Sequence, residues 1–380
     1  MSLAAFTFWI VLLVLWHTFI GYTLLIAVLG WLRDEPPLQP IMTETPDVTV
    51  VVSVHNESSR ISTRLQNIFS ADYPADKLHV IVVSDGSTDD TVAQLESIAH
   101  PRVSLIIQPH RQGKAAALNL AVKHATSELI VFTDIRQRFA PDAIRLLVRH
   151  FSSLETGAVS GELVIEKAAS TAGSGVDFYW KLEKFVRRNE SRWDSTIGCT
   201  GAIYAIRRNL FSPLPPDTIL DDVVIPMQIA MQKYRVRFEP KAIAYDPQTL
   251  EPAREQIRKR RTLAGNYQML FRYPVWLLPW RSRLWWHLLS HKYLRLVAPF
   301  LLVALFVSNT VIVGKNIYGL FLLGQTLFYL LAFSGLRYHR FKTRFLSLPA
   351  GFLFLNWQAV VALWQYLRNP KSATWQMTAK

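Results

Sequence analysis

Four short apolar runs, each rich in β-branched residues, follow one another between residues 48 and 132. They are Val48–Val54, Leu78–Val83, Val103–Ile107 and Leu129–Phe132, and their starts lie 30, 25 and 26 residues apart. Nearly continuous apolar runs of this length are typical of strands buried on both faces, and the spacing leaves room for one helix after each strand. We therefore predict repeated strand–helix units that form a doubly wound, mostly parallel α/β sheet.

The segments between these strands support the predicted alternation. Each carries apolar residues three or four positions apart, as a helix with one buried face does. These residues are Ile61, Leu65 and Ile68 after the first strand, and Val92, Leu95 and Ile98 after the second. One helix is therefore expected in each connection.

The N-terminal segment has a different pattern, because residues 1–32 contain no Asp, Glu, Lys or Arg and Arg33 is the first charged residue. About 20 apolar residues are enough to cross a bilayer. A cleaved signal peptide is the alternative, but it requires a basic start and a small-residue cleavage site, and neither is evident. We predict a retained transmembrane anchor over residues 1–33.

Three further segments without acidic or basic residues follow near the C-terminus, at Leu296–Gly314, Asn316–Leu336 and Phe345–Leu367. Short loops rich in Lys and Arg stay on the cytoplasmic side of a membrane. The loop between the last two segments is of this kind, with Arg337, Arg340, Lys342 and Arg344. The long polar middle of the chain is then cytoplasmic, and the N-terminus lies outside.

The last apolar segment leaves an open question. Four full spans would place the tail over residues 368–380 outside, although it contains Arg368, Lys371 and Lys380. The segment also contains Asn356 and Gln358, so it either spans the membrane or lies at its interface. The region over residues 296–367 is therefore expected to hold two or three spans.

Residues 275–295 precede the predicted spans and interleave Trp and Leu with Arg, Lys and His. This composition is typical of an amphipathic helix that lies in the plane of the interface.

Composition narrows the possible functions. Half of the residues are hydrophobic and 18% are charged, which excludes a disordered chain. Cys199 is the single cysteine, so a disulfide framework and a multi-cysteine metal cluster are excluded. Much of the net charge of +14 belongs to the membrane-facing segments, so a nucleic-acid partner is not expected.

Polar residues follow three of the predicted strands at the point where each strand ends. His55, Asn56 and Glu57 follow the first, Asp85–Asp90 the second, and Asp134 with Arg136 the fourth. Ligands bind such sheets beyond the carboxyl ends of the strands. Each group alone could be an ordinary helix N-cap, but together they indicate a site for a diphosphate and a metal ion. The sequence contains no GxGxxG or Walker motif, so a dinucleotide or P-loop nucleotide is not indicated.

An ordered series of motifs resembles the family 2 glycosyltransferases, which are inverting enzymes of GT-A fold that use nucleotide sugars. The motifs are SVHNE (53–57), VVSDGSTDD (82–90), GKAAALN (113–119), FTDIRQ (132–137), GCTGAIYAIRR (198–208), TILDD (218–222) and EQIRKRR (255–261). The resemblance implies a Rossmann-like GT-A domain over about residues 46–270. It is strongest to the membrane-integrated branch, which includes synthases of chitin oligomers, poly-N-acetylglucosamine, hyaluronan and cellulose.

The resemblance also implies roles for individual residues. Asp222 matches the general base, and Asp134 matches the first Asp of the DxD motif, which binds the diphosphate through Mg²⁺ or Mn²⁺. The residues implied to bind the nucleotide sugar are His55, Asn56, Glu57, Asp85, Lys114, Asp134, Arg136 and Arg258, and those on the acceptor side are Gly198, Thr200, Gly201 and Asp221. Without the resemblance, Asp222 could equally be a helix N-cap, and the GCTGA segment a tight structural turn.

Two positions depart from the family pattern. The third position of the DxD motif is Arg136, which offers no oxygen ligand to a metal ion, so it could instead pair with the diphosphate directly. In the QxxRW motif Arg258 is retained, but Lys259 stands where the family has the Trp that stacks on the acceptor sugar. The second departure weakens the expectation of long-chain processivity.

The sequence therefore predicts an integral membrane protein, of the kind found in a bacterial inner membrane, with a cytoplasmic glycosyltransferase domain. We expect it to transfer a sugar from a UDP-linked donor to a growing glycan in polysaccharide synthesis. Single glycosylation of a membrane lipid and a catalytically silent membrane scaffold remain alternatives. The expected partners are the nucleotide sugar, a glycan or lipid acceptor, the bilayer and other polysaccharide-export components.

Overall fold

The computed structural model describes residues 2–33, 45–167, 174–248, 252–314, 316–337 and 344–369. The chain divides into two compact units. One, here called the sheet unit, comprises residues 33–169, 190–251 and 371–380; the other, the helical unit, comprises residues 1–32, 170–189 and 252–370. The predicted tail falls almost wholly outside the described residues, as does most of the basic loop after residue 337.

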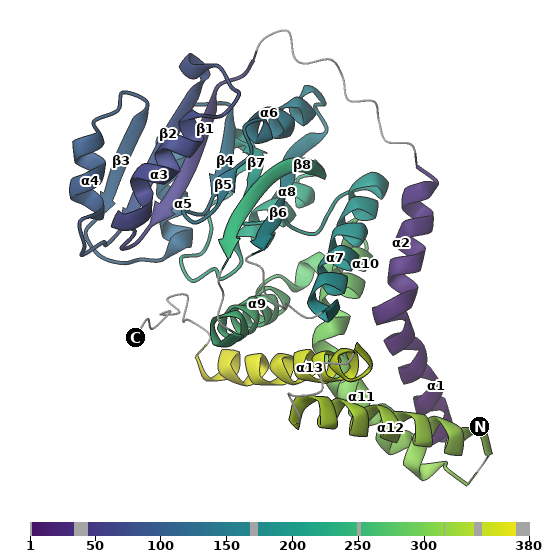
Figure 1. Ribbon diagram of the computed structural model, residues 1–380. Coiled ribbons are helices and arrows are strands. Elements are labelled where there is room, and N and C mark those ends of the chain that lie inside the picture. The colour runs from purple at the N-terminus through teal and green to yellow at the C-terminus, as the bar shows by residue number, and fades with distance from the viewer. Residues whose placement is uncertain are drawn as a thin grey trace. The chain divides into compact units, whose positions relative to one another are not determined.

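The sheet unit is built on a single eight-stranded sheet among the described residues (Figure 1). In spatial order the strands are β3 (Val103–Gln108), β2 (Leu78–Asp85), β1 (Val48–Val54), β4 (Leu129–Thr133), β7 (Tyr204–Arg207), β6 (Thr156–Lys167), β8 (Arg235–Gln248) and β5 (Arg138–Phe139). The first four pair in parallel, as do β6 and β8, whereas β7 is antiparallel to both its neighbours and β5 to β8. All four strands predicted from the apolar runs are present, and the predicted α/β class is confirmed.

Helices cover both faces of the parallel half. The core that contains Val48, Val50, Val52 and Val54 also contains the apolar side of α3 (Ser58–Phe69). Val51 is fully buried on the opposite face, where α5 (Lys114–His124) packs against β1 and β2. Because both faces of β1 are covered, almost every residue of this strand must be apolar, which explains the VTVVVSV run.

The remaining helices of the sheet unit occupy the connections between strands. They are α4 (Thr91–Ile98), η2 (Ala75–Lys77), α6 (Ala143–Val148), η3 (Arg149–Ser152), η4 (Arg208–Leu210) and α8 (Asp221–Met231). The strand order places β1 between β2 and β4: the chain passes from β1 to β2 and β3 on one side, and then returns to β4 on the other side of β1. The carboxyl ends of β1, β2 and β4 therefore lie at one edge of the sheet, at the switch point where such folds bind ligands.

A register shift between Ser160 and Glu162 bends β6 where it pairs with β8. At Gly161, a Cβ atom would lie 2.4 Å from the carbonyl oxygen of Ala242 and 2.7 Å from a methyl group of Ile203. Neither neighbour is the end of a long flexible chain, so a side chain at this position forces the two strands apart.

We expect Gly161→Ala to destabilise the sheet unit by about 1–3 kcal/mol through overpacking. Thermal unfolding of the detergent-solubilised chain measures the change as a lower midpoint. Glu96→Ala, on the exposed side of α4, is the control and should leave the midpoint nearly unchanged. Equal midpoints for Gly161→Ala and wild type would contradict the close strand contact.

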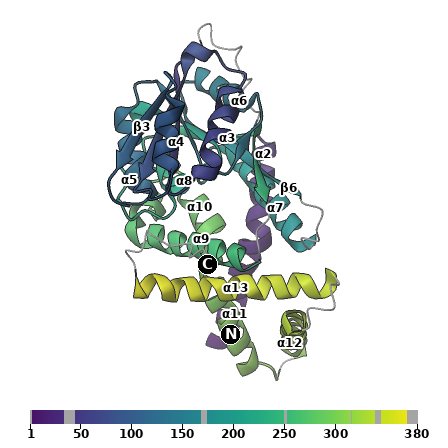
Figure 2. The same ribbon diagram turned by 60° about the vertical axis from the view of Figure 1, so that its left-hand side comes forward.

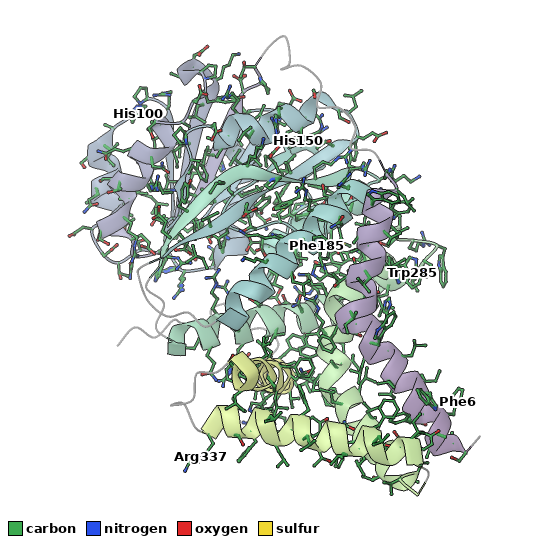
Figure 3. The ribbon with its side chains drawn as sticks, turned by 45° about the vertical axis from the view of Figure 1, so that its right-hand side comes forward. Phe6, His100, His150, Phe185, Trp285 and Arg337 are labelled. Carbon is green, nitrogen blue, oxygen red and sulfur yellow. The ribbon has the colours of Figure 1, made fainter. Side chains whose placement is uncertain are left out.

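The helical unit begins with a nearly continuous helix made of α1 (Leu3–Trp16), the π-helical turn η1 (His17–Gly21) and α2 (Tyr22–Trp31). Its α1 portion packs against α11 (Leu294–Val311), and the shared core includes Phe8, Leu15, Ala298 and Leu305. Other apolar residues of α1 face away from this core: Phe6 is 52% exposed and projects outward in Figure 3. Exposed apolar side chains of this kind suit contact with lipid.

Four helices of the described residues are long and apolar enough to cross a membrane: Leu3–Trp31, Trp285–Val311, Ile317–Arg337 and Leu346–Arg368. They correspond to the four apolar segments predicted from the sequence. The last two belong to α12 (Asn316–Arg337) and α13 (Arg344–Arg368). Arg337 is exposed at the end of α12 and points away from the helices (Figure 3).

The prediction of a single amphipathic helix over residues 275–295 is wrong. The chain forms a short turn, η5 (Pro274–Leu277), and becomes helical again only at Trp285, in α10 (Trp285–Leu288). From there the helix continues through η6 (Leu289–Tyr293) into α11. Pro279 explains the difference, because a proline inside a helix removes a backbone donor and clashes with the preceding turn.

Two more helices complete this unit, α7 (Ser174–Trp193, shared with the sheet unit beyond residue 189) and α9 (Pro252–Arg272). Glu183 of α7 lies 3.0 Å from His291, 3.5 Å from Arg295 and 3.7 Å from Lys292. Burial would raise the pKa of Glu183, but these basic neighbours hold it well below its ordinary value. The carboxylate is therefore ionised, and it ties α7 to the start of α11.

Candidate active site

Three carboxylates and one ammonium group meet at the carboxyl edge of the sheet. Asp134 directly follows β4, and Asp221 and Asp222 begin α8. Lys114, the first residue of α5, places its Nζ 2.9 Å from Asp134 Oδ1 and 3.0 Å from Asp221 Oδ2. The lysine therefore joins two carboxylates that lie far apart in the sequence.

The protonation of Lys114 follows from this contact. Burial alone would lower the pKa of the ammonium group, but Asp134, Asp221 and Asp222 raise it above its ordinary value. Lys114 is therefore cationic at neutral pH, and its charge offsets the repulsion between the carboxylates. The Asp134 side chain is 38% exposed, whereas that of Asp221 is only 7% exposed, so Asp134 is the more accessible to a ligand.

Asp222 is held from the opposite side by the glycine-rich segment. The Gly201 amide donates to Asp222 Oδ2 at 3.1 Å, and the Cys199 amide donates to the backbone carbonyl of Asp222 at 2.7 Å. Gly198 has φ of +86°, and a Cβ atom there would lie 3.0–3.2 Å from Val223. Only glycine adopts this conformation without strain, so the segment wraps closely around the start of α8.

Asp221 and Asp222 lie in the first turn of α8, next to backbone N–H groups that have no acceptor within the helix. The N-terminus of a helix carries a partial positive charge that stabilises carboxylates. Neither residue is the N-cap, which is Leu220, and Asp222 uses one oxygen for the Gly201 amide. The alternative of Asp222 as the helix N-cap is therefore not what the structure contains.

Asp85 organises the loop that carries Lys114. Its carboxylate is 4% exposed and accepts backbone N–H groups from Gln112 at 2.6 Å and from Gly113 at 2.9 Å. Gly113 has φ of +95°, which allows the sharp turn into α5. The anionic side chain at the end of β2 thus sets where α5, and with it Lys114, begins.

The residues after β1 are bonded to those after β2. His55 donates from Nδ1 to the Asp85 carbonyl at 2.8 Å, and Asn56 exchanges hydrogen bonds with Thr88. The Glu57 amide donates to Thr91 at 2.8 Å, while its carboxylate pairs with the exposed Arg60. These bonds bring His55, Asn56 and Glu57 next to Asp85, as the strand pattern predicts.

Arg136 has a partner outside the carboxylate group. Its guanidinium lies 3.4 Å from Asp246 Oδ2 on β8, and Gln137 donates to the same oxygen at 3.2 Å. Asp246 is 2% exposed and needs such donors. Arg136 therefore stabilises a buried carboxylate in this structure, and its predicted contact with a diphosphate stays a prediction.

The predicted site residues differ in how the structure groups them. It brings together Lys114, Asp134, Asp221, Asp222 and Gly201, and it places His55, Asn56, Glu57 and Asp85 at the neighbouring strand ends. Thr200 bonds through its amide to Ser160 at 3.0 Å. Arg258 lies on α9 in the helical unit, so its role toward the donor also stays a prediction.

Two buried residues near these carboxylates were missed by the sequence analysis. The Arg64 guanidinium donates to Thr133, the residue before Asp134, at 2.7 Å. The Tyr204 ring stacks on Phe132 with ring centroids 4.9 Å apart, and its hydroxyl has no hydrogen-bond partner among the described residues. Burial raises the pKa of Tyr204, and Asp221 and Asp222 raise it further. A polar residue inside an apolar helix face or strand was the available signal for both.

We expect Asp85→Asn to lower stability by about 1–3 kcal/mol, because the amide replaces one of two oxygens that accept backbone N–H groups. The thermal unfolding midpoint of the solubilised chain measures the change. Asp90→Asn, an exposed residue of the same loop, is the matched control and should leave the midpoint unchanged. If both variants unfold with the wild type, Asp85 does not hold the loop.

Comparison with known proteins shows that the chain is similar to glycosyltransferases. The family model described as Glycosyl transferase family 2 matches residues 49–214. The poly-beta-1,6-N-acetyl-D-glucosamine synthase of Staphylococcus aureus (strain COL) is 24% identical over 237 residues, which cover 60% of this chain and 57% of that protein. The probable glycosyltransferase YdaM of Bacillus subtilis (strain 168) is 26% identical over 229 residues, 56% of this chain and 54% of that protein. The chain thus aligns with little more than half the length of these relatives.

A solved structure resembles the chain over more of its length. It is a mannosyltransferase, PcManGT, from Pyrobaculum calidifontis in complex with GDP-Man and Mn²⁺. The two share 26% sequence identity with a TM-score of 0.69, and the match covers 94% of this chain and 99% of that one. Together with the family model, this match confirms the expected GT-A-like α/β fold.

Proposed function

We propose that the protein transfers a sugar from a nucleotide-sugar donor to a glycan acceptor in polysaccharide synthesis. The proposal starts from the match of residues 49–214 to the Glycosyl transferase family 2 model. The observation that carries the proposal is the meeting of Lys114, Asp134, Asp221 and Asp222 at the carboxyl edge of the sheet. The similarity to a poly-N-acetylglucosamine synthase supports the glycan acceptor.

The proposed reaction is a single displacement. The acceptor hydroxyl oxygen attacks the anomeric carbon on the side opposite the diphosphate, its proton passes to the Asp222 carboxylate, and the bond from the anomeric carbon to the diphosphate oxygen breaks. The hydrogen bond from the Gly201 amide to Oδ2 orients the Asp222 carboxylate. The configuration inverts, so an α-linked donor yields a β-linked product.

Lys114 is the proposed stabiliser of the leaving diphosphate. It is cationic, and its Nζ already contacts the two aspartates that border the site. A fixed cation next to the place where negative charge develops lowers the barrier without reorganisation at the moment of reaction. Asp85 acts indirectly, because it sets the position of the loop before Lys114.

A divalent cation fits this arrangement. The described residues contain no group of three His, Cys, Asp or Glu side chains that could hold a metal alone. Mg²⁺ and Mn²⁺ are commonly bound by one or two carboxylates together with substrate phosphates, and the half-exposed Asp134 is the carboxylate available. Bound there, the ion would neutralise charge on the diphosphate. The presence of Mn²⁺ in the similar mannosyltransferase supports this proposal.

The donor is proposed to be UDP-linked, with GDP-mannose as the competing choice because the similar mannosyltransferase carries GDP-Man. Nucleotide release by detergent-purified protein, with UDP-glucose, UDP-N-acetylglucosamine or GDP-mannose, identifies the donor. Asp222→Asn should lower release by about 10²–10⁴-fold, since the base is lost. Asp76→Asn, exposed on η2, is the matched control and should keep full activity. Release that survives Asp222→Asn would remove Asp222 as the base.

Chelation tests the proposed metal. We expect release to stop in excess EDTA, to return with Mg²⁺ or Mn²⁺, and to fall in Asp134→Asn with a higher metal concentration required for half-maximal rate. Asp142→Asn, at the N-cap of α6, is the control and should keep the metal requirement of the wild type. Full activity in the chelator would mean that the cationic side chains alone stabilise the diphosphate.

The second candidate function is transfer of a single sugar to a membrane lipid. Lys259 in place of the acceptor-stacking Trp favours it, since a glycan chain loses its stacking platform. The reaction product separates the two functions: a ladder of sugars supports the glycan acceptor, whereas one lipid-linked unit supports the lipid acceptor. A silent scaffold would release no nucleotide with any donor.

A further inference from the structure

The last apolar helix, α13, has two different sides. Trp357, Trp364 and Leu367 lie within one half of the helix surface and are 57–62% exposed. Asn356 and Gln358 are 7% and 1% exposed, and Ala359 and Ala362 are also buried. A helix that buries amides against protein and exposes tryptophans is unlike a span surrounded by lipid, and it has the character of a helix at the membrane–water interface.

The buried side of α13 contacts α9 at two separate points. Arg260 Nε donates to Gln358 Oε1 at 2.5 Å, and the rings of Phe271 and Tyr366 stack with centroids 5.7 Å apart and planes 7° apart. From the first contact to the second, the chain advances eleven residues on α9 and eight on α13, or about 16 Å and about 12 Å along the helix axes. Both contacts lie between the middle and the C-terminal end of α13, so α9 packs against that part of the helix (Figure 2).

The charges of α9 limit how α13 can be oriented relative to the membrane. Four successive cationic residues, Arg258–Arg261, lie in the first half of α9, and Arg272 ends it. Gln358 lies near the middle of α13, so if α13 crossed the bilayer, its partner Arg260 would lie deep in the hydrocarbon layer, where a charge is costly. If α13 lies parallel to the surface, α9 stays at headgroup level and its cations face water and lipid phosphates.

Charge near the C-terminal end of α13 agrees with the second arrangement. The Arg368 guanidinium lies 4.3 Å from the centroid of the Trp364 ring. A cation over an exposed tryptophan suits the headgroup region, where the ring is buried among acyl chains and the charge remains hydrated. Lys371 and Lys380 follow in the sequence, and an interfacial α13 leaves them on the same side as the basic loop before it.

We propose that α13 does not cross the membrane although it is long and apolar enough, and that it docks on the cytoplasmic leaflet beside α9 through Trp357, Trp364 and Leu367. The chain then has three spans, and both ends of α13 are cytoplasmic. This proposal concerns the lipid surface and does not depend on the proposed enzyme activity. It also removes the conflict between four apolar segments and a basic C-terminal tail.

Cysteine labelling tests the proposal directly. Cys199 is the single native cysteine, so Cys199→Ala gives a cysteine-free background. Single cysteines are then introduced before α13 (Thr343→Cys), after it (Ser372→Cys) and in the turn between α11 and α12 (Gly314→Cys), where a Cβ atom meets nothing within 4 Å. Intact cells are treated with a membrane-impermeant maleimide, before and after permeabilisation of the inner membrane.

We expect Thr343→Cys and Ser372→Cys to react only after permeabilisation and Gly314→Cys to react in intact cells. A spanning α13 would place residues 343 and 372 on opposite sides, and that result would overturn the proposal. Each variant is accepted only when its nucleotide release, or its elution in detergent, matches that of the background protein.

Fluorescence quenching gives a second, independent measurement on the nearly native chain. Trp357 and Trp364 are seven residues apart, or about 10 Å along the helix axis. The protein is placed in vesicles of lipids brominated either near the headgroup or deep in the acyl chain. Trp357→Phe and Trp364→Phe should each remove a part of the tryptophan fluorescence that the shallow bromines quench more strongly than the deep ones. Different depths for the two residues would show that α13 is inclined across the bilayer.

Discussion

The contact of Lys114 with Asp134 and Asp221 is the interaction on which the arrangement of the sheet unit's functional edge depends. Carboxylates from the end of β4 and the start of α8 repel each other at this separation unless a cation lies between them. The cation comes from a third element, α5, so all three elements have to be placed together. Asp85 adds a fourth element, because its carboxylate fixes the backbone that precedes Lys114.

The same constraint explains how the neighbouring cations are distributed. Arg136 is two residues from Asp134, yet it pairs with Asp246 and so leaves the space around Asp134 to Lys114. Arg64 is buried beneath the end of β4 and bonds to Thr133. Each of these cations satisfies a different buried acceptor, which avoids crowding of like charges and leaves Asp134 partly exposed to a ligand.

In the helical unit, the free-energy cost of burying charge determines which apolar helices can cross the membrane and which lie at its surface. Glu183 is surrounded by His291, Lys292 and Arg295, so this buried acid is compensated within the unit. The cationic segment Arg258–Arg261 of α9 favours a position near water, because a charge in the hydrocarbon layer is costly. By hydropathy, α11 and α13 are both candidate membrane spans. They differ in their neighbours, because α13 packs against the cationic helix α9.

The sequence by itself determined the parallel half of the sheet, the polar strand ends and the four apolar helices, because these features repeat with the period of a strand or a helix and depend on near neighbours. The prediction of one amphipathic helix over residues 275–295 was wrong, because it rested on composition and did not take account of Pro279. Only the tertiary structure decided that Lys114 pairs with Asp221, that Arg136 pairs with Asp246, and that α9 contacts α13. These contacts join residues that are far apart in the chain, and their distances follow from strand order and helix packing, which no local pattern encodes.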